Sequence, residues 1–305
     1  MARRGFSNSL YVAELRYIQS IHETSELQNP DSAVREFLSL LQQLRCRWLT
    51  PKSIATLRAD PFYYYLLART KYYDGVFLEA IAENVGYIIN IGCGTDTRSR
   101  RFATLLRQKG IAVLECDQPK AISIKQHMVK RLGTYDHISY ASIDLNAKTW
   151  PVFEHWLVTH NARKALVLME GVSPYIDAES FTRFLGLLGT TLPPASRVAY
   201  DFKIQGVADE FGLVGRIARP FRLRPTTDEI SAFHKGLGFR LKHFEPSFEL
   251  STRLLARRKE PKPSLFGEDA LVQLEVETGT NLGQANNPDL EGTGPAPLFD
   301  SLSMR

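Results

Sequence analysis

The sequence predicts an α/β protein with a mostly parallel sheet and helices on both faces. Two observations lead to this expectation. Between residues 87 and 202, short apolar runs alternate with stretches of helical periodicity, the pattern of parallel strands connected by helices. Two more apolar runs follow at 239–244 and 251–256, and the short loop between them favours an antiparallel pair. The expected sheet is therefore parallel except at its final strands.

The residues before the first strand show helical periodicity only. Residues 1–84 are therefore expected to form an N-terminal helical lid region. Asp31 and Ser32 can cap a helix over residues 33–44, whose apolar stripe extends to Leu41. Pro61 suits the first turn of the next helix, because proline lacks a backbone N–H that this turn does not need.

Residues 85–259 are expected to form the core, which makes one domain with the lid region. The parallel strands are expected, in chain order, at 87–91, 111–116, 138–143, 165–169 and 197–202. The helices between them are expected at 99–108, 119–132, 152–160 and 178–188. A further helix over 227–237, capped by Thr227 or Asp228, precedes the antiparallel pair.

The sequence changes character near residue 260. From there it is rich in Gly, Pro, Asn and Glu, with only scattered apolar residues. Such a stretch buries too little surface to offset the entropy of the chain. Residues 260–305 are therefore expected to form a mostly disordered tail, in which 271–276 can form a brief ordered element.

The composition is typical of a globular domain, with 44% hydrophobic and 23% charged residues. No apolar run reaches the roughly 18–20 residues of a membrane helix, and the first residues do not resemble a secretory signal, so no membrane association is expected. The net charge is +5, and the basic residues include three separate clusters, at 98–101, 216–224 and 257–259, which are expected to face solvent. Their separation argues against a nucleic-acid partner. Cys46, Cys93 and Cys116 have no metal-like spacing and favour a reducing, cytoplasmic setting without a disulfide or metal site.

A glycine turn follows the first expected strand, in the segment IINIGCGTDTR at 88–98. Gly92 and Gly94 allow a sharp turn and a close approach of the backbone to a ligand at the carboxyl end of the strand. A dinucleotide-binding turn would carry glycine or alanine where this chain has Thr97, so NAD binding is disfavoured. On its own, the segment is equally compatible with a tight turn that binds nothing.

Acidic residues follow the next three expected strands. Asp117, roughly 20 residues beyond the glycines, can accept hydrogen bonds from ribose hydroxyls and can also cap the following helix. Asp144 can bind an adenine amino group beside the apolar Leu145, or can be an ordinary residue at a strand end. Glu170 follows a buried strand, where a carboxylate needs a partner. A cationic cofactor is one candidate, and S-adenosylmethionine carries an ammonium and a sulfonium.

Taken together, these segments resemble the leucine carboxyl methyltransferase family, which includes bacterial small-molecule O-methyltransferases. The resemblance is carried by LART at 67–70 with Asp74, NIGCGTDTR at 90–98, ECDQP at 115–119, Asp144-Leu145, and EGVSPY at 170–175. These segments occur in the family's order and at compatible spacings. The resemblance implies a class I methyltransferase (Rossmann-like) fold, with S-adenosylmethionine as cofactor and S-adenosylhomocysteine as product.

The resemblance also implies seven cofactor-binding residues. They are Arg69 at the methionine carboxylate, Gly92 and Gly94 along the methionine, Asp117 at the ribose, Asp144 and Leu145 around the adenine, and Glu170 near the methyl end. The protein-methylating branch of the family uses an N-terminal lysine, for which Lys52 is only a weak match. No catalytic residue is assigned.

The acceptor is predicted from the chemistry of methyl transfer. A carboxylate acceptor is ionised at neutral pH and needs no base, whereas a hydroxyl is helped by one. No histidine stands out as a base, which mildly favours a carboxylate. The expected function is an O-methyltransferase acting on a carboxylate or hydroxyl of a small, polyketide-like metabolite. A protein C-terminal carboxyl methyltransferase and a catalytically inactive binding module of the same fold remain alternatives, and the oligomeric state is not predicted.

Overall fold

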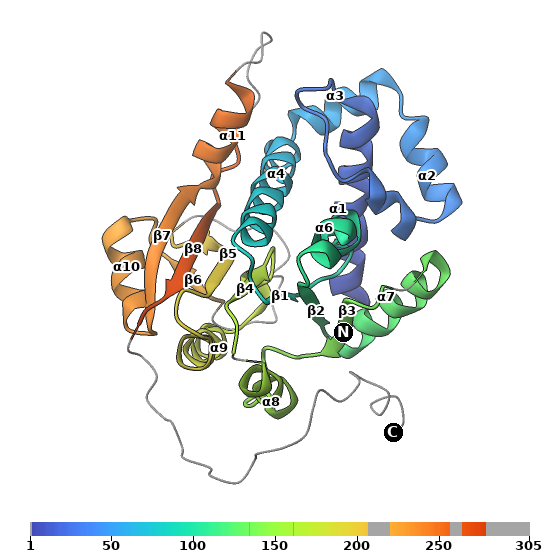
Figure 1. Ribbon diagram of the computed structural model, residues 1–305. Coiled ribbons are helices and arrows are strands. Elements are labelled where there is room, and N and C mark those ends of the chain that lie inside the picture. The colour runs from blue at the N-terminus through green and yellow to red at the C-terminus, as the bar shows by residue number, and fades with distance from the viewer. Residues whose placement is uncertain (1, 134, 161, 207–219, 257–263, 279–305) are drawn as a thin grey trace.

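The computed structural model describes residues 2–133, 135–160, 162–206, 220–256 and 264–278. These residues form an eight-stranded sheet with helices on both faces (Figure 1). The strand order is β3-β2-β1-β4-β5-β8-β7, and the short β6 pairs with β5. β1 to β6 pair in parallel, whereas β8 is antiparallel to both β5 and β7. The predicted α/β class and the antiparallel end of the sheet are confirmed.

The described strands and helices follow one another much as predicted. The strands are β1 (Tyr87–Ile91), β2 (Ala112–Asp117), β3 (Ile138–Ser142), β4 (Ala165–Met169), β5 (Arg197–Ile204), β6 (Arg222–Leu223), β7 (Phe239–Pro246) and β8 (Asp269–Val276). The α-helices are α1 (Ala2–His22), α2 (Leu40–Arg47), α3 (Pro51–Ala59), α4 (Pro61–Ala82), α5 (Arg98–Arg101), α6 (Ala103–Gln108), α7 (Pro119–Leu132), α8 (Pro151–Thr159), α9 (Ala178–Thr191), α10 (Thr227–Lys235) and α11 (Ser247–Leu255). Two 3-10 helices, η1 (Ser32–Phe37) and η2 (Ser173–Tyr175), complete the described elements.

The core has two layers because side chains alternate across each strand. Ile88 of β1 packs with α4 on one face, while its neighbour Ile89 packs with α8 and α9 on the other. Figure 1 shows α4 and α6 above the sheet and α8 and α9 below it. The sheet is thus buried on both faces, as its near-continuous apolar strands require.

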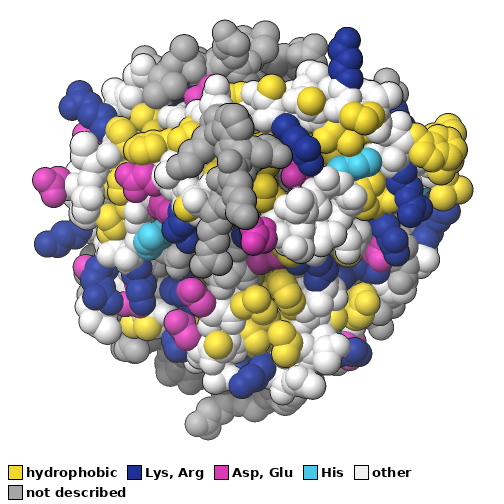
Figure 2. Space-filling model, turned by 90° about the horizontal axis from the view of Figure 1, so that it is seen from above, with side chains coloured by type: hydrophobic (Ala, Val, Ile, Leu, Met, Phe, Trp, Pro, Cys, Tyr) yellow, Lys and Arg dark blue, Asp and Glu magenta, His cyan; other side chains and the backbone are white. Residues whose placement is uncertain are grey.

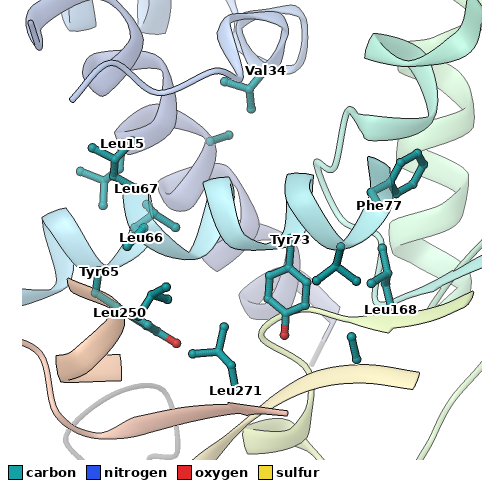
Figure 3. Close-up of a cluster of buried hydrophobic side chains, with 14 of the residues drawn as sticks. Leu15, Val34, Tyr65, Leu66, Leu67, Tyr73, Phe77, Leu168, Leu250 and Leu271 are labelled. Atoms are coloured by element: carbon teal, nitrogen blue, oxygen red, sulfur yellow. The ribbon is translucent and has the colours of Figure 1, made fainter. Parts of the chain in front are cut away.

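Helix α4 forms the centre of the upper layer. Its side chains Tyr65, Leu66, Leu67, Tyr73 and Phe77 are all buried and spread along the helix in Figure 3. In the same view, strand residues from β4 and β8 lie on the sheet side of the helix. Because most of its side chains are buried, the sequence of α4 is largely apolar. This burial also allows a polar residue of α4 to reach the strand ends.

The helix predicted over 33–44 is wrong as a single element. The chain forms η1, then an extended residue at Leu38, and only then α2, which begins after Ser39. Ser39 and Gln42 form a capping box, a start signal that the prediction overlooked. Leu41 is 80% exposed and does not belong to the predicted apolar stripe.

The strand predicted at 251–256 is also wrong. Residues 247–255 form α11, and the antiparallel partner of β7 is β8, which lies inside the predicted tail. β8 is inserted between β5 and β7, and most of its side chains are buried. The tail therefore cannot begin at residue 260, and the rest of it from 279 onward lies outside the described residues.

Smaller differences concern helix boundaries and caps. The helix predicted at 99–108 is divided into α5 and α6 at Phe102. α10 begins after Thr226 without a side-chain cap, so neither Thr227 nor Asp228 caps it. Among the helices of the described ranges, none has the length and apolar character of a membrane span.

Candidate functional site

The glycine turn after β1 is shaped by contacts inside the protein. Gly92 has φ +68° and Gly94 has φ +35°, conformations that favour glycine. A Cβ at Gly92 would lie 2.4 Å from Val172 Cγ2, and a Cβ at Gly94 would lie 2.5 Å from Ser9 Oγ. The packing of the turn therefore accounts for both glycines without a ligand, and the case for a ligand must come from neighbouring side chains.

Helix α1 is fastened to this turn by hydrogen bonds. Thr95 N donates to Ser9 Oγ (3.0 Å), and the Arg16 guanidinium donates to Thr95 O (3.2 Å) and Thr95 Oγ1 (2.8 Å). Asn8 of the same helix donates to the Tyr175 hydroxyl (3.1 Å), which lies beyond β4. The described part of α1 thus lies over the glycine turn and reaches the segment after β4.

Asp117 is the last residue of β2 and lies beside the glycine turn. Its two carboxylate oxygens accept hydrogen bonds from Gly94 N (2.8 Å) and Gln118 N (2.7 Å). Burial raises the pKa of the Asp117 carboxyl above its ordinary value, and these two hydrogen bonds oppose the rise. Helix α7 begins without a side-chain cap, so Asp117 does not serve as the helix cap that the sequence also allowed.

Asp144 and Leu145 lie in the loop after β3, two strands from the glycine turn. Asp144 is exposed, and its Oδ1 accepts a hydrogen bond from Asn146 N (3.0 Å). Leu145 is buried against the lower layer of the core. Asn146 Nδ2 donates to Tyr175 O (3.2 Å), so this loop is tied to the segment after β4. Asp144 therefore has a carboxylate that faces solvent and makes one local hydrogen bond.

Arg69 of α4 brings a buried guanidinium to the ends of β4 and β5. Its Nε donates to Glu170 Oε1 (3.2 Å), and its Nη1 donates to Asp201 Oδ2 (3.1 Å). A Cβ at Gly171 would lie 3.7 Å from both Nη atoms, so the guanidinium lies against the turn after β4. Arg69 and Glu170, predicted as separate cofactor contacts, thus form an ion pair with each other.

A second buried arginine extends this ion-pair network. Arg98 is 1% exposed, and its guanidinium lies between Asp74 (2.8 Å), Asp96 (2.6 Å) and Glu170 (2.8 Å). The sequence placed Arg98 in a cluster expected to face solvent, and the structure corrects that expectation. Glu170 is therefore held from both sides, by Arg69 and by Arg98.

Asp201 of β5 is the main site residue that the sequence prediction missed. It is 2% exposed, and burial raises the pKa of its carboxyl to about 6, while the charge of Arg69 lowers it. A signal was available, because Asp201 and Lys203 are charged residues that alternate with apolar ones in this strand. Buried charges in such a position need partners.

The strand order brings the predicted residues to one edge of the sheet. The carboxyl ends of parallel strands share an edge, and β3, β2, β1 and β4 are successive neighbours there. Along that edge lie, in order, Asp144 and Leu145, then Asp117, then Gly92 and Gly94, then Glu170 with Arg69. The seven residues predicted from the resemblance therefore all lie at or near this edge.

The aromatic residues near Arg69 belong to the core. Tyr65 is fully buried and stacks on Phe266 with ring centroids 4.6 Å apart. The Arg69 guanidinium lies 5.9 Å from the ring centroid of Phe62 and 5.4 Å from that of Tyr65, within the range of cation–π contacts. These rings therefore pack against the Arg69 guanidinium.

Charged side chains are mixed on the surface. Figure 2 shows basic and acidic side chains interspersed over the described part of the face seen from above. Of the arginine cluster near residue 220, Arg216 and Arg219 lie outside the described residues, while Arg224 is exposed and 3.9 Å from Glu229. No partner follows from this distribution.

Comparisons with known sequences point to one family. The family model of leucine carboxyl methyltransferases matches residues 23–188. A protein of Mycolicibacterium smegmatis, provisionally named an S-adenosyl-L-methionine-dependent methyltransferase, is 27% identical over 138 residues, 45% of this chain and 43% of its own length. A Mycobacterium ulcerans protein with the same name is 25% identical over 173 residues, 56% of each chain. The chain thus spans about half the length of the curated relatives it matches.

Solved structures show more distant similarity. Magnesium protoporphyrin IX methyltransferase from Synechocystis, solved with S-adenosylhomocysteine, has a TM-score of 0.46 and 13% identity, covering 81% of this chain and 99% of its own. The [4+2]-cyclase SpnF has a TM-score of 0.43 and 13% identity, covering 68% of this chain and 81% of its own.

Proposed function

Because the chain belongs to the leucine carboxyl methyltransferase family, a family of S-adenosylmethionine-dependent enzymes, we propose that it transfers the methyl group of S-adenosylmethionine to an oxygen of a small molecule. The acceptor is a carboxylate or hydroxyl of a polyketide-like metabolite. The observation that carries this proposal is the order of polar groups along one edge of the sheet. An exposed carboxylate, a second carboxylate, a glycine turn and a buried arginine follow one another there, the order required by an adenine, a ribose and an amino acid.

The chemistry of the side chains fits this cofactor. Asp117 uses one lone pair of each oxygen for a backbone N–H, so further lone pairs remain for ribose hydroxyls. Arg69 uses Nε and Nη1 for internal carboxylates, and its Nη2 bonds no side chain or backbone group in the described ranges. An arginine fork suits a carboxylate, such as that of the methionine part.

The residues of the chain would bind and orient the cofactor through hydrogen bonds and charge, and no side chain needs to form a covalent bond with it. Bound S-adenosylmethionine supplies an activated methyl group on its sulfonium. The catalytic contribution of the protein is then to align the acceptor oxygen with that methyl group and to exclude water. Glu170 adds a negative charge near the ammonium and sulfonium, and it is held in place by Arg69 and Arg98.

A carboxylate is the favoured acceptor. It is ionised at neutral pH and therefore needs no general base, whereas a hydroxyl does benefit from one. The buried His234 bonds the Tyr200 hydroxyl (2.6 Å) in the layer below the sheet, away from the proposed site. The family name points to carboxylate chemistry as well.

The proposal is tested by calorimetric titration of the purified protein with S-adenosylhomocysteine. We expect micromolar binding, and we expect Asp117→Ala to weaken it by about 1–3 kcal/mol through the lost charged hydrogen bonds. Glu245→Gln is the matched control, because Glu245 is a mostly buried carboxylate of β7 that pairs with Arg253. A folded wild-type protein that binds neither S-adenosylhomocysteine nor S-adenosylmethionine would contradict the proposal. If binding is found, transfer of a labelled methyl group to a panel of carboxylic acids and phenols identifies the acceptor class.

A further inference from the structure

The Arg69 guanidinium is held from two sides by carboxylates of different strands. Glu170, just after β4, accepts from Nε, and Asp201 of β5 accepts from Nη1. Because the guanidinium is planar, fixing Nε and Nη1 also fixes the direction of the remaining N–H groups. The question is which of the two carboxylates serves Arg69 and which serves another purpose.

Glu170 forms ion pairs with two arginines, whereas Asp201 forms its ion pair with Arg69. The second oxygen of Glu170 lies 2.8 Å from Arg98, so Glu170 has another cation. Asp201 makes its ion pair with Arg69, and its neighbour Asp269 is paired with Lys203 at 2.8 Å. Within the described ranges, Arg69 is thus the cation that contacts Asp201.

Asp201 also fixes the turn that lies against the guanidinium. Its Oδ1 accepts a hydrogen bond from Gly171 N (2.6 Å), and Tyr73 Oη lies 3.4 Å from the same oxygen. Its backbone carbonyl accepts from Ser173 Oγ (2.7 Å). Met169 of β4 is paired with Tyr200 of β5. The next residue along each chain segment, Glu170 after Met169 and Asp201 after Tyr200, therefore lies beside the other. One residue of β5 therefore fixes the arginine and the turn beside it.

We propose that Asp201 is a positioning residue that aims the Arg69 guanidinium at the carboxylate of the methionine part of S-adenosylmethionine. This inference rests on the proposed function. Asp201 itself is buried and paired with Arg69, and it acts through that arginine. Its loss should therefore affect ligands that carry the amino acid part and spare ligands that lack it.

The test compares two ligands that differ in that part. S-adenosylhomocysteine has the amino acid, and 5′-methylthioadenosine has the same adenosine and thioether without it. Both are titrated into the wild type, Asp201→Asn and the control Glu245→Gln. Asparagine keeps the size of the side chain and an oxygen for Gly171 N, but it removes the charge that holds Nη1. We expect Asp201→Asn to weaken S-adenosylhomocysteine binding about tenfold, the order of a lost charged hydrogen bond, and to leave 5′-methylthioadenosine within about twofold.

A double-mutant cycle tests whether Asp201 acts through Arg69. Arg69→Lys keeps a charge between the two carboxylates but removes the planar fork. In that background, we expect Asp201→Asn to weaken S-adenosylhomocysteine binding clearly less than it does in the wild type. If Asp201→Asn does not fold, Asp201→Glu replaces it in both experiments, because glutamate keeps the charge but shifts the carboxylate that holds Nη1, and the same selective loss is expected.

The outcomes separate the two proposals. If the wild type binds neither ligand, the proposed function fails, and this inference fails with it. If the wild type binds both and Asp201→Asn weakens both equally, or weakens neither, the proposed function stands and the positioning role is overturned. Additive effects in the cycle would also overturn it.

Discussion

The two ends of the proposed cofactor site are built differently. At the methionine end, Arg69 and Glu170 are largely buried and belong to an ion-pair network that joins α4, α5, β4 and β5. At the adenine end, Asp144 is exposed, and its carboxylate accepts a hydrogen bond from within its own loop. The fold holds the side chains of the methionine end in one arrangement before a ligand binds. The exposed carboxylate of the adenine end can instead adjust its position to the ligand. The difference suggests that the protein recognises the amino acid strictly and the base loosely.

The largest expected effect is at the centre of the buried network. Arg98→Met would leave Asp74, Asp96 and Glu170 without a shared cation, and we expect it to lower the free energy of unfolding by about 3–5 kcal/mol. Denaturant unfolding followed by circular dichroism measures it. Arg224→Met, which removes an exposed arginine 3.9 Å from Glu229, is the control and should stay within about 0.5 kcal/mol. If Arg98→Met and Arg224→Met lower the free energy of unfolding equally, the buried ion pairs of Arg98 contribute no more to stability than an exposed arginine does.

The core layer below the sheet contains a titratable residue, His234, that belongs to neither end of the proposed cofactor site. Burial lowers the pKa of His234 from the ordinary 6.5 to about 4. Between these values the unfolded chain binds a proton that the native protein does not, so stability is lost as pH falls from 6.5 towards 4. The loss expected from this residue is about 3 kcal/mol.

The variant His234→Gln isolates this contribution from the carboxylates that titrate in the same range. Unfolding free energies of the wild type and the variant are measured at several pH values between 4 and 7. We expect the wild type to lose about 3 kcal/mol more than the variant across this window. If the unfolding free energies of the wild type and the variant change equally with pH, His234 does not cause the loss of stability.

The smallest effect is expected at the adenine end. Asp144→Ala should change the free energy of unfolding by less than about 0.5 kcal/mol, because its carboxylate is exposed. It should weaken S-adenosylhomocysteine binding by a factor of about two to five, since an exposed hydrogen bond contributes little net free energy. A loss as large as that of Asp117→Ala would show that the adenine end is as strictly organised as the rest, and the comparison would no longer hold.

The sequence predicted the parts of the molecule that follow local rules. The bounds of β1, β4 and α7 agree with the expected 87–91, 165–169 and 119–132, because apolar runs and a proline at the helix start mark them. The alternation of strands and helices together with the family resemblance also predicted the mostly parallel sheet with an antiparallel end. The resemblance further drew attention to Arg69, Asp117 and Glu170, which the structure places at one edge.

What the sequence could not predict depends on contacts between distant segments. β8 lies within a region of polar average composition, so the sequence predicted only a brief ordered element at 271–276 and not its place between β5 and β7. Residues 251–256 have apolar positions that suit either a strand or a helix, and packing of α11 against α4 decides for the helix. The ion pair of Arg69 with Asp201 joins residues 132 positions apart in sequence, and it forms because α4 packs against the sheet where β5 carries Asp201.

The position of β8 has a consequence for how the chain reaches this fold. β8 pairs with β5 on one side and with β7 on the other, although both are synthesised before it. On the ribosome, β5 and β7 therefore emerge with open edges, and such edges are templates for association with other chains. Until residues 269–276 have left the exit tunnel, the nascent chain depends on other means, such as chaperones, to protect them. A destabilised β8 would consequently appear first as aggregation during synthesis, before any loss of cofactor binding in the finished protein.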